Sequence, residues 1–230
     1  MRRRGILSVL ALTAVCLFGG PALNAGRPVD LALVLAVDCS YSVSADEFRK
    51  QVTGLSLALR DPEVIASIQG GRHGAISVAV VQWSSSGAKV AAVPWTLIDS
   101  PGAAHRLADR IAVTQRLTRE GGTSISHALE FSAALFAVNP FEGERRVIDV
   151  SGDGRNNNGV KLRPVRDRVV ADGITINGLV ILNEDPTLDR YFESDVIGGV
   201  GAFIVRADDY DDYLEAIRRK LLREINNLVS

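Results

Sequence analysis

The sequence has very little cysteine: two residues in 230, Cys16 and Cys39. Cys16 lies in an N-terminal stretch that we expect to be removed, which leaves Cys39 alone. A single cysteine excludes an intramolecular disulfide, even in an oxidising compartment. We therefore expect a hydrophobic core to stabilise the fold. Cys39 is either a reactive thiol or a small buried residue, and we favour burial because no base lies near it in the sequence.

Histidine is also scarce, and an excess of charge of either sign is absent. The three histidines, His73, His105 and His127, are too far apart for the usual spacing of zinc ligands. The formal net charge is -1, from 26 basic and 27 acidic residues, without a basic or acidic tail. A nucleic-acid-binding surface needs clustered Lys and Arg, so we exclude nucleic acid as a partner.

Signatures of common enzyme classes are missing as well. The chain contains no Gly-x-Ser-x-Gly elbow. Residues 154–161 resemble a phosphate-binding loop, but Val160 stands where that loop needs lysine. An aspartyl phosphotransferase would need a second Asp at position 40, which is Ser40. We expect a protein that is not an enzyme, and keep a metal-dependent hydrolase or phosphotransfer-type enzyme as the alternative.

The N-terminus has the features of an export signal. Arginines at positions 2–4 precede an apolar run, 6–18, that is short for a bilayer span and ends at Gly19-Gly20-Pro21. Ala25 suits the position before a cleavage site. We predict a signal peptide over 1–25 and one domain over 26–230, periplasmic or secreted, with no stable membrane span after the leader is removed. An uncleaved leader that anchors the chain is the alternative, and export by the general secretory or the twin-arginine route stays open.

Hydrophobic patterns predict strands that alternate with helices. A continuous apolar run at 29–37 is typical of a strand buried on both faces, and Ser44 with Glu47 forms a capping box for the helix that follows. The turn at 84–87 is so short that the strands beside it must be antiparallel. The predicted strands are 29–37, 75–83, 89–98, 146–150, 174–182 and 202–205. The predicted helices are 44–59, 103–114, 123–138, 165–171, 188–195 and one that starts in the run 208–212.

These elements predict an α/β fold: a doubly wound, mostly parallel six-stranded sheet with one antiparallel edge strand and helices on both faces. The acidic run Asp208, Asp209, Asp211 and Asp212 suits the start of the last helix, whose end is basic. We prefer that interpretation to a calcium loop, because the glycine that such a loop needs at its turn is absent.

Polar side chains follow two strands that end at the same edge of the predicted sheet. Asp38, Ser40 and Ser42 occupy alternate positions after the first strand, and Asp153 follows the strand at 146–150. Thr123 adds a hydroxyl at the start of a helix. Doubly wound sheets bind ligands at the carboxyl ends of their strands, so these side chains are candidates for one site. Capping or turn bracing by the two aspartates is the structural alternative.

Together these residues resemble the metal-ion-dependent adhesion site of von Willebrand A domains, also called integrin I domains. Asp38, Ser40 and Ser42 match the Asp-x-Ser-x-Ser loop, Thr123 matches the threonine of the second loop, and Asp153 matches the aspartate of the third. Ser-Gly precedes Asp153, where Thr is more usual. The chain is therefore similar to an uncharacterised bacterial, exported subfamily of these domains. The resemblance implies a von Willebrand A, Rossmann-like fold and a protein partner whose Glu or Asp completes the metal shell.

The chemistry of the five residues agrees with this resemblance. Two carboxylates and three hydroxyls are an all-oxygen set, which suits Mg²⁺ foremost, with Mn²⁺ as a possible replacement. A purely structural metal, or a site that holds none, is a further alternative. The asparagines at 156–158 either orient this site or form a solvated turn, and we favour the turn.

Overall fold

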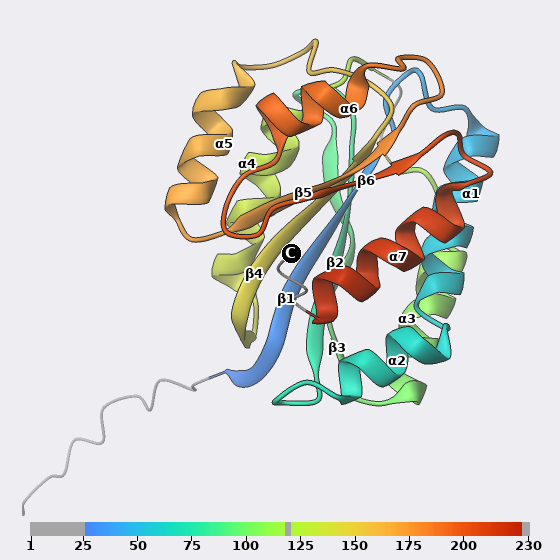
Figure 1. Ribbon diagram of the computed structural model, residues 1–230, viewed down its shortest axis with the longest axis vertical. Helices are drawn as coiled ribbons and strands as arrows, with labels where there is room; N and C mark the ends of the chain where they lie inside the picture. The colour runs from blue at the N-terminus through green and yellow to red at the C-terminus, as the bar shows by residue number, and fades with distance from the viewer. Residues whose placement is uncertain (1–25, 118–120, 227–230) are drawn as a thin grey trace, which may run out of the picture.

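A computed structural model describes residues 26–117 and 121–226 (Figure 1), so the predicted signal peptide lies outside the described residues. Six strands form one sheet: β1 Arg27–Asp38, β2 Ile76–Trp83, β3 Lys89–Ile98, β4 Phe141–Gly152, β5 Thr175–Ile181 and β6 Ile204–Ala207. Its helices are α1 Ala45–Ala58, α2 Pro62–Gln69, α3 Pro101–Ala112, α4 Ile125–Leu135, α5 Leu162–Ala171, α6 Leu188–Tyr191 and α7 Tyr213–Asn226. A 3₁₀ turn, Phe136–Val138, extends α4, and a π turn, Phe192–Val196, extends α6.

The order of the strands confirms the predicted fold class. The sheet runs β3-β2-β1-β4-β5-β6, and every neighbouring pair is parallel except β2 with β3. The antiparallel strand β3 lies at the edge, as the short turn predicted. The chain leaves β1 toward β2 and later returns to its other side as β4. The strand order therefore reverses between β1 and β4, where doubly wound sheets bind their ligands.

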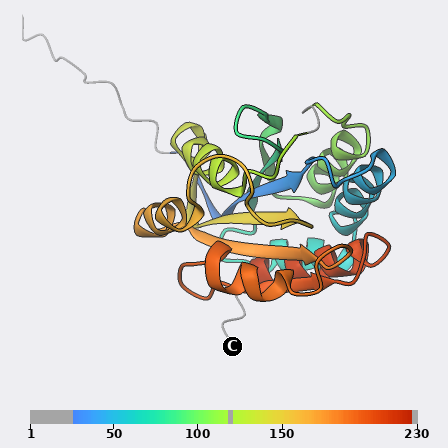
Figure 2. The same ribbon diagram turned by 90° about the horizontal axis from the view of Figure 1, so that it is seen from above.

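Helices cover both faces of the sheet, which explains the apolar run 31–37 of β1. Leu33 and Leu35 face a core formed with α1, α2, α3 and α7, whereas Val34 and Ala36 face a core formed with α4, α5 and α6. Figures 1 and 2 show these two layers from two sides. Among the described residues, no helix is long and apolar enough to cross a membrane.

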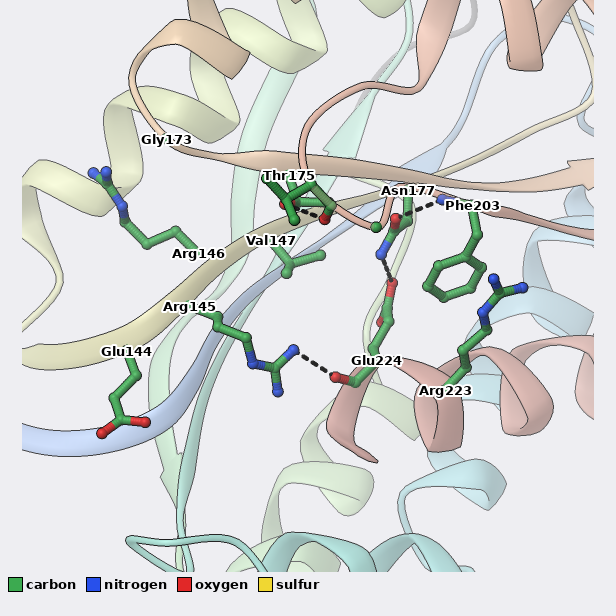
Figure 3. A pocket seen from close by; sticks show the side chains of 12 residues that line it. Glu144, Arg145, Arg146, Val147, Gly173, Thr175, Asn177, Phe203, Arg223 and Glu224 are labelled. Carbon is green, nitrogen blue, oxygen red and sulfur yellow. Dashed lines mark hydrogen bonds between the residues drawn. The ribbon is translucent and has the colours of Figure 1, made fainter. Parts of the chain in front are cut away.

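Buried charged groups attach α7 to the sheet. The Lys220 ammonium lies 2.8 Å from the Asp149 carboxylate of β4 and 2.6 Å from that of Glu224, and all three side chains are buried. The Glu224 carboxylate also accepts a hydrogen bond from Asn177 of β5, and the Glu224 carbonyl accepts one from Arg145 (Figure 3). Removal of one charge would leave its partner buried and unpaired, so we expect such a change to destabilise this end of α7.

Some predicted boundaries were wrong. The first helix ends before Asp61-Pro62, as predicted, but a second helix was missed: Asp61 accepts hydrogen bonds from the backbone of Glu63 and Val64 and begins α2. Strand β4 begins five residues before its predicted start, because Phe141 pairs with Arg27 of β1. Strand β6 begins two residues after its predicted start of 202, at Ile204.

Candidate metal centre

The loop after β1 folds around the Asp38 carboxylate. Asp38 is the last residue of β1, fully buried, and its Oδ1 accepts a hydrogen bond of 2.7 Å from the backbone N–H of Ser40. This bond turns the chain so that the hydroxyls of Ser40 and Ser42 lie 3.2 Å apart. The side chains of alternate residues therefore converge, as the sequence predicted.

The loop after β4 meets this loop through Asp153. The Ser42 hydroxyl donates to Asp153 Oδ1 at 2.7 Å, and the Tyr210 hydroxyl donates to Asp153 Oδ2 at 3.0 Å. Tyr210 lies just before α7 and was not predicted, because only its place among acidic residues distinguishes it in the sequence. Val37 pairs with Ser151 across β1 and β4, so neighbouring strands deliver the two aspartates to one edge.

Thr123 reaches the same edge from the loop before α4. Its side chain is 4% exposed, and its backbone N–H donates to Asn157 Oδ1 at 2.8 Å. The Thr123 carbonyl accepts a hydrogen bond of 2.9 Å from the backbone N–H of Asn157. Thr123 lies two residues before Ile125, where α4 begins, although we predicted that the helix starts at 123. Asn157 thus binds both the N–H and the carbonyl of Thr123, and this fixes the backbone from which the Thr123 side chain extends.

Glycines on both sides of Asp153 leave space for the other candidate ligands. A Cβ atom at Gly152 would lie 3.1 Å from Asp38 Oδ2. At Gly154 it would lie 3.3 Å from the Thr123 hydroxyl oxygen. The structure thus brings together all five predicted residues: Asp38, Ser40, Ser42, Thr123 and Asp153.

Two residues that were not predicted hold the backbone of the first loop. The Arg116 guanidinium donates to the carbonyl oxygens of Cys39, Ser40 and Val43. The Gln51 side chain donates to the carbonyl oxygen of Asp38 at 3.0 Å. Each acts on residues far along the chain, which no local pattern can reveal. Cys39 is buried, in agreement with the interpretation that we favoured.

The asparagines at 156–158 order the neighbouring loops, which is the alternative that we did not favour, although Asn157 is exposed as in a solvated turn. The Asn156 side chain accepts a hydrogen bond of 3.0 Å from the backbone N–H of Ser126 in α4. The Asn158 side chain accepts one of 2.8 Å from the N–H of Ser86, in the turn between β2 and β3. Together with the bond from Thr123 to Asn157, they connect three segments beside the candidate site.

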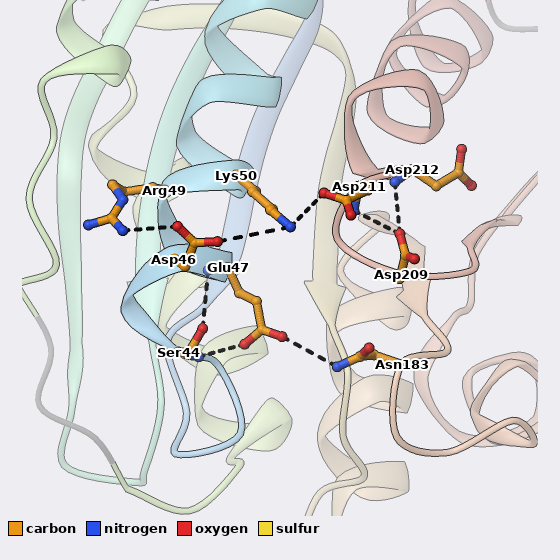
Figure 4. A network of polar contacts seen from close by, with 9 residues as sticks. All are labelled: Ser44, Asp46, Glu47, Arg49, Lys50, Asn183, Asp209, Asp211 and Asp212. Carbon is orange, nitrogen blue, oxygen red and sulfur yellow. Dashed lines mark hydrogen bonds and ion pairs between the residues drawn. The ribbon is translucent and has the colours of Figure 1, made fainter.

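The acidic run at 208–212 forms a turn before α7 instead of the first turn of the helix. The Asp209 carboxylate accepts hydrogen bonds from the backbone N–H groups of Asp211 and Asp212 at 2.8 and 3.1 Å. Asp211 lies 2.5 Å from the Lys50 ammonium of α1 (Figure 4). Tyr210 lies between Asp209 and Asp211, so these contacts also hold the backbone of Tyr210.

The electrostatics of the site favour a bound cation. Burial, and then the charge of Asp153, raise the pKa of Asp38 to about 8, against hydrogen bonds from Ser40 that lower it. Burial also raises the pKa of Asp153, although bonds from Ser42 and Tyr210 oppose the shift. Asp38 Oδ2 is buried and has no hydrogen-bond partner in the described part of the chain. A buried oxygen of this kind is costly unless a charge is placed against it, so the donor set fits a divalent cation.

The candidate ligands border an open hollow in the surface. Its lining is made by Tyr41, Ser42, Gly121, Gly122, Thr123, Gly154, Asn157 and Glu184. Tyr41, between the two loop serines, is 78% exposed. An aromatic side chain at this exposure is free to contact another molecule.

Comparisons with solved structures show similar folds. Proximal thread matrix protein 1 from the mussel byssus superimposes with a TM-score of 0.64 at 15% identity, over 87% of this chain and 48% of that chain. Another structure of that protein, with a zinc occupied MIDAS motif, gives 0.60 at 14% identity, over 87% and 49%.

Two bacterial structures are similar as well. A von Willebrand factor type A structure from Catenulispora acidiphila gives a TM-score of 0.57 at 16% identity, over 86% of this chain and 43% of that one. The pilus adhesin SpaC from Lactobacillus rhamnosus GG gives 0.58 at 14% identity, over 86% and 31%. The chain thus spans half or less of these structures, and at such identities the likeness concerns the fold, which is that of von Willebrand A domains.

The family comparison covers nearly all of the described chain. None of the curated proteins matches it. The family model described as "Protein of unknown function (DUF1194)" matches residues 28–229, and the chain belongs to that family.

Proposed function

We propose that this chain is an exported binding module that holds one divalent cation and docks a protein partner through it. Asp38, Ser40, Ser42, Thr123 and Asp153 would hold the cation, with the charge supplied by the two aspartates. The observation that carries the proposal is the buried, unpartnered Asp38 Oδ2 beside a second carboxylate and three hydroxyls.

The donor atoms favour Mg²⁺, with Mn²⁺ as a replacement. All five side chains offer oxygen, and hard cations such as Mg²⁺ prefer oxygen ligands in octahedral geometry. The zinc in the MIDAS motif of the mussel protein supports the capacity of this fold to hold a divalent ion. For this chain, the absence of nitrogen and sulfur from the predicted set places Mg²⁺ ahead of zinc.

The surroundings of the five residues support docking of an acidic side chain. Ser40, Ser42 and Thr123 contribute no charge, so a bound cation would keep an affinity for a further carboxylate from a partner. Without a cation, the same carboxylate would be repelled by Asp38 and Asp153. The hollow beside them is open, and Tyr41 extends from its rim.

An enzyme is the alternative, and the residues around the site divide over it, because the pKa of Asp38, about 8, would suit a general acid or base whereas that of Tyr210 would not. A general acid or base works best when its pKa is close to the working pH. Burial raises the pKa of Tyr210 far above neutrality, and its hydroxyl is bonded to Asp153. Assays against a panel of phosphate esters, with Mg²⁺ and with chelator, test the alternative. Turnover that requires Asp38 would replace our proposal.

The proposal is tested with the exported chain and with partners captured from its native compartment. We expect excess Mg²⁺ to raise the melting temperature, because a ligand that binds only the folded state stabilises it by mass action. Asp38→Ala and Asp153→Ala should abolish the increase, whereas the control Asp172→Asn should not. Asp172 is exposed and lies at the end of α5.

Docking is tested by a substitution that leaves both carboxylates in place. A captured partner is titrated by calorimetry with Mg²⁺, with chelator and against Thr123→Ala, and Thr53→Ala on the exposed side of α1 is the control. We expect binding to require Mg²⁺ and to weaken only in Thr123→Ala. Equal affinity under all conditions would contradict docking through the ion.

A further inference from the structure

A second group of metal-ligating side chains lies at the other end of β1. Asp30 of β1, His73 of the loop before β2, and Glu144 of β4 each offer one ligand atom, and these atoms lie within 4.8 Å of one another. Asp30 precedes Asp38 by eight residues of one strand. At roughly 3.3 Å for each residue, that separation is about 26 Å. The two groups are too far apart to share an ion.

The sheet and one loop bring the three side chains together. Strands β1 and β4 pair in parallel with Leu31 opposite Arg145, so Asp30 and Glu144 lie side by side one residue earlier. The backbone N–H of His73 donates to Asp30 Oδ1 at 2.9 Å. The His73 ring nitrogen Nε2 lies 2.9 Å from Glu144 Oε1. His73 is therefore held between the two carboxylates, through its backbone N–H on one side and its ring on the other.

The loop before β2 closes tightly over the Asp30 carboxylate. A Cβ atom at Gly71 would lie 2.3 Å from Asp30 Oδ2, so a side chain there would displace the carboxylate. The backbone N–H of Ala75 donates to the same oxygen at 3.3 Å. Asp30 and His73 are both partly buried, and the His73 side chain is 22% exposed. The Asp30 carboxylate is thus fixed in direction before anything binds, which lowers the entropic cost of binding.

Two arginines lie near these carboxylates, and one of them contacts Glu144. The Arg72 guanidinium lies 2.9 Å from Glu144 Oε1, but its side chain is 78% exposed. Arg145 donates to the carbonyl oxygens of Glu224 and Ile225, and Figure 3 shows its guanidinium turned away from the Glu144 carboxylate. Burial lowers the pKa of Arg145, and the neighbouring carboxylates, Glu144 among them, oppose that shift. Arg72 is therefore the competitor that a cation would displace from Glu144, and exposed pairs of this kind are weak.

We propose that Asp30, His73 and Glu144 form a second divalent-cation site, selective for zinc and similar ions and independent of the site at Asp38. An imidazole nitrogen with two carboxylate oxygens suits Zn²⁺, Co²⁺ or Ni²⁺ better than Mg²⁺, which prefers oxygen alone. The bound ion would join β1, β4 and the loop before β2. It would stabilise the end of the sheet opposite the proposed docking surface.

The test uses untagged, metal-free protein and Zn²⁺ as the probe. The double variant Asp38→Ala, Asp153→Ala removes the site at Asp38, so that Zn²⁺ can bind only elsewhere. If this variant does not fold, wild-type protein is titrated in excess Mg²⁺ instead. We expect calorimetry to find one Zn²⁺ per chain in this background, with an increase in melting temperature. His73→Asn and Glu144→Gln should each lower the Zn²⁺ affinity by at least about tenfold.

Two controls separate a built site from adventitious binding. His105→Asn removes an exposed histidine of α3 and should leave Zn²⁺ binding unchanged. Arg72→Ala removes the competing cation and should strengthen Zn²⁺ binding. The proposal is overturned if no Zn²⁺ binds in the background without the other site. It is equally overturned if His73→Asn and His105→Asn have the same affinity. Neither result bears on the proposed Mg²⁺ site, because in both measurements that site is either removed by substitution or filled with Mg²⁺.

Discussion

The Ser42 hydroxyl donates a 2.7 Å hydrogen bond to Asp153 Oδ1, across 111 positions of sequence. It joins the loop after β1 to the loop after β4, at the point where the strand order reverses. Ser42 is thus both a candidate ligand and a connection between the two loops that carry the carboxylates. This double role makes its removal informative.

Ser42→Ala should lower both the stability of the fold and the affinity for Mg²⁺. Loss of one partly buried hydrogen bond should lower the free energy of unfolding by about 1 kcal/mol. Loss of a ligand that also orients Asp153 should weaken Mg²⁺ binding by at least about tenfold. Urea denaturation and calorimetry measure the two effects. The control is Ser67→Ala on α2, where both quantities should stay close to wild type. Wild-type Mg²⁺ affinity in Ser42→Ala would exclude Ser42 from the site.

The stability of the metal-free protein should fall as the pH rises toward 8. The pKa of Asp38 in the folded state is about 8, well above its ordinary value near 4, because the carboxylate is buried beside Asp153. A raised pKa favours the folded state while the group is protonated. That contribution is complete below about pH 4 and is lost as the pH rises through 8.

A bound cation should remove this dependence, because it competes with the proton on Asp38. We expect Mg²⁺ affinity to increase from about pH 5 to pH 8 and then level off. Melting temperatures across this range, with chelator and with excess Mg²⁺, measure both trends. Asp38→Asn removes this titrating group and should lose its share of the pH dependence, whereas Asp153 and Asp149, whose pKa values burial also raises, keep theirs. If its curve matches that of the wild type, another group causes the dependence.

Asn157→Ala should weaken metal binding without touching a candidate ligand. Its side chain accepts the backbone N–H of Thr123, and outer groups that orient a ligand affect metal affinity by roughly 10–100-fold. Asn158→Ala is the matched control, because Asn158 accepts the N–H of Ser86 in a neighbouring turn. Both variants should lose about 1–3 kcal/mol of stability through an unsatisfied N–H. Only Asn157→Ala should lose Mg²⁺ affinity, and Asn157→Asp, which keeps the acceptor, should recover it.

Sequence patterns predicted the parts of this molecule that depend on local order. The apolar run of β1 needs no distant partner to be recognised, because burial on both faces favours apolar residues along most of the strand. The hairpin of β2 and β3 follows from a short turn. The meeting of Asp38 and Asp153 was predicted because Asp38 ends β1 and Asp153 follows β4 at the same edge of the sheet. The second helix, α2, was missed because Asp61-Pro62 stops one helix and starts another with the same two residues.

The supporting groups could not be predicted, because their partners lie far along the chain. Arg116 contacts carbonyl groups 73 to 77 positions away, and backbone carbonyls leave no mark in the sequence. Tyr210 meets Asp153 only because α7 packs beside α1. The asparagines at 156–158 were noticed, but a solvated turn and a loop brace have the same composition. Only the fold distinguishes the two interpretations.

Arg116→Ala should be the most destabilising single change around the proposed docking surface. Its guanidinium is bonded to the carbonyl oxygens of Cys39, Ser40 and Val43, which together form the backbone of the first loop. Hydrogen bonds from a charged donor are worth about 1.5–3 kcal/mol each, so we expect a loss of more than about 3 kcal/mol in the free energy of unfolding. Arg116→Lys keeps the charge but not the planar fork, and should recover less than half of the loss. Arg49→Ala, in an exposed pair with Asp46, should change stability by less than about 1 kcal/mol. Urea denaturation of the three metal-free variants measures these differences. If Arg116→Lys is as stable as wild type, charge alone matters there, and the loop does not depend on the fork.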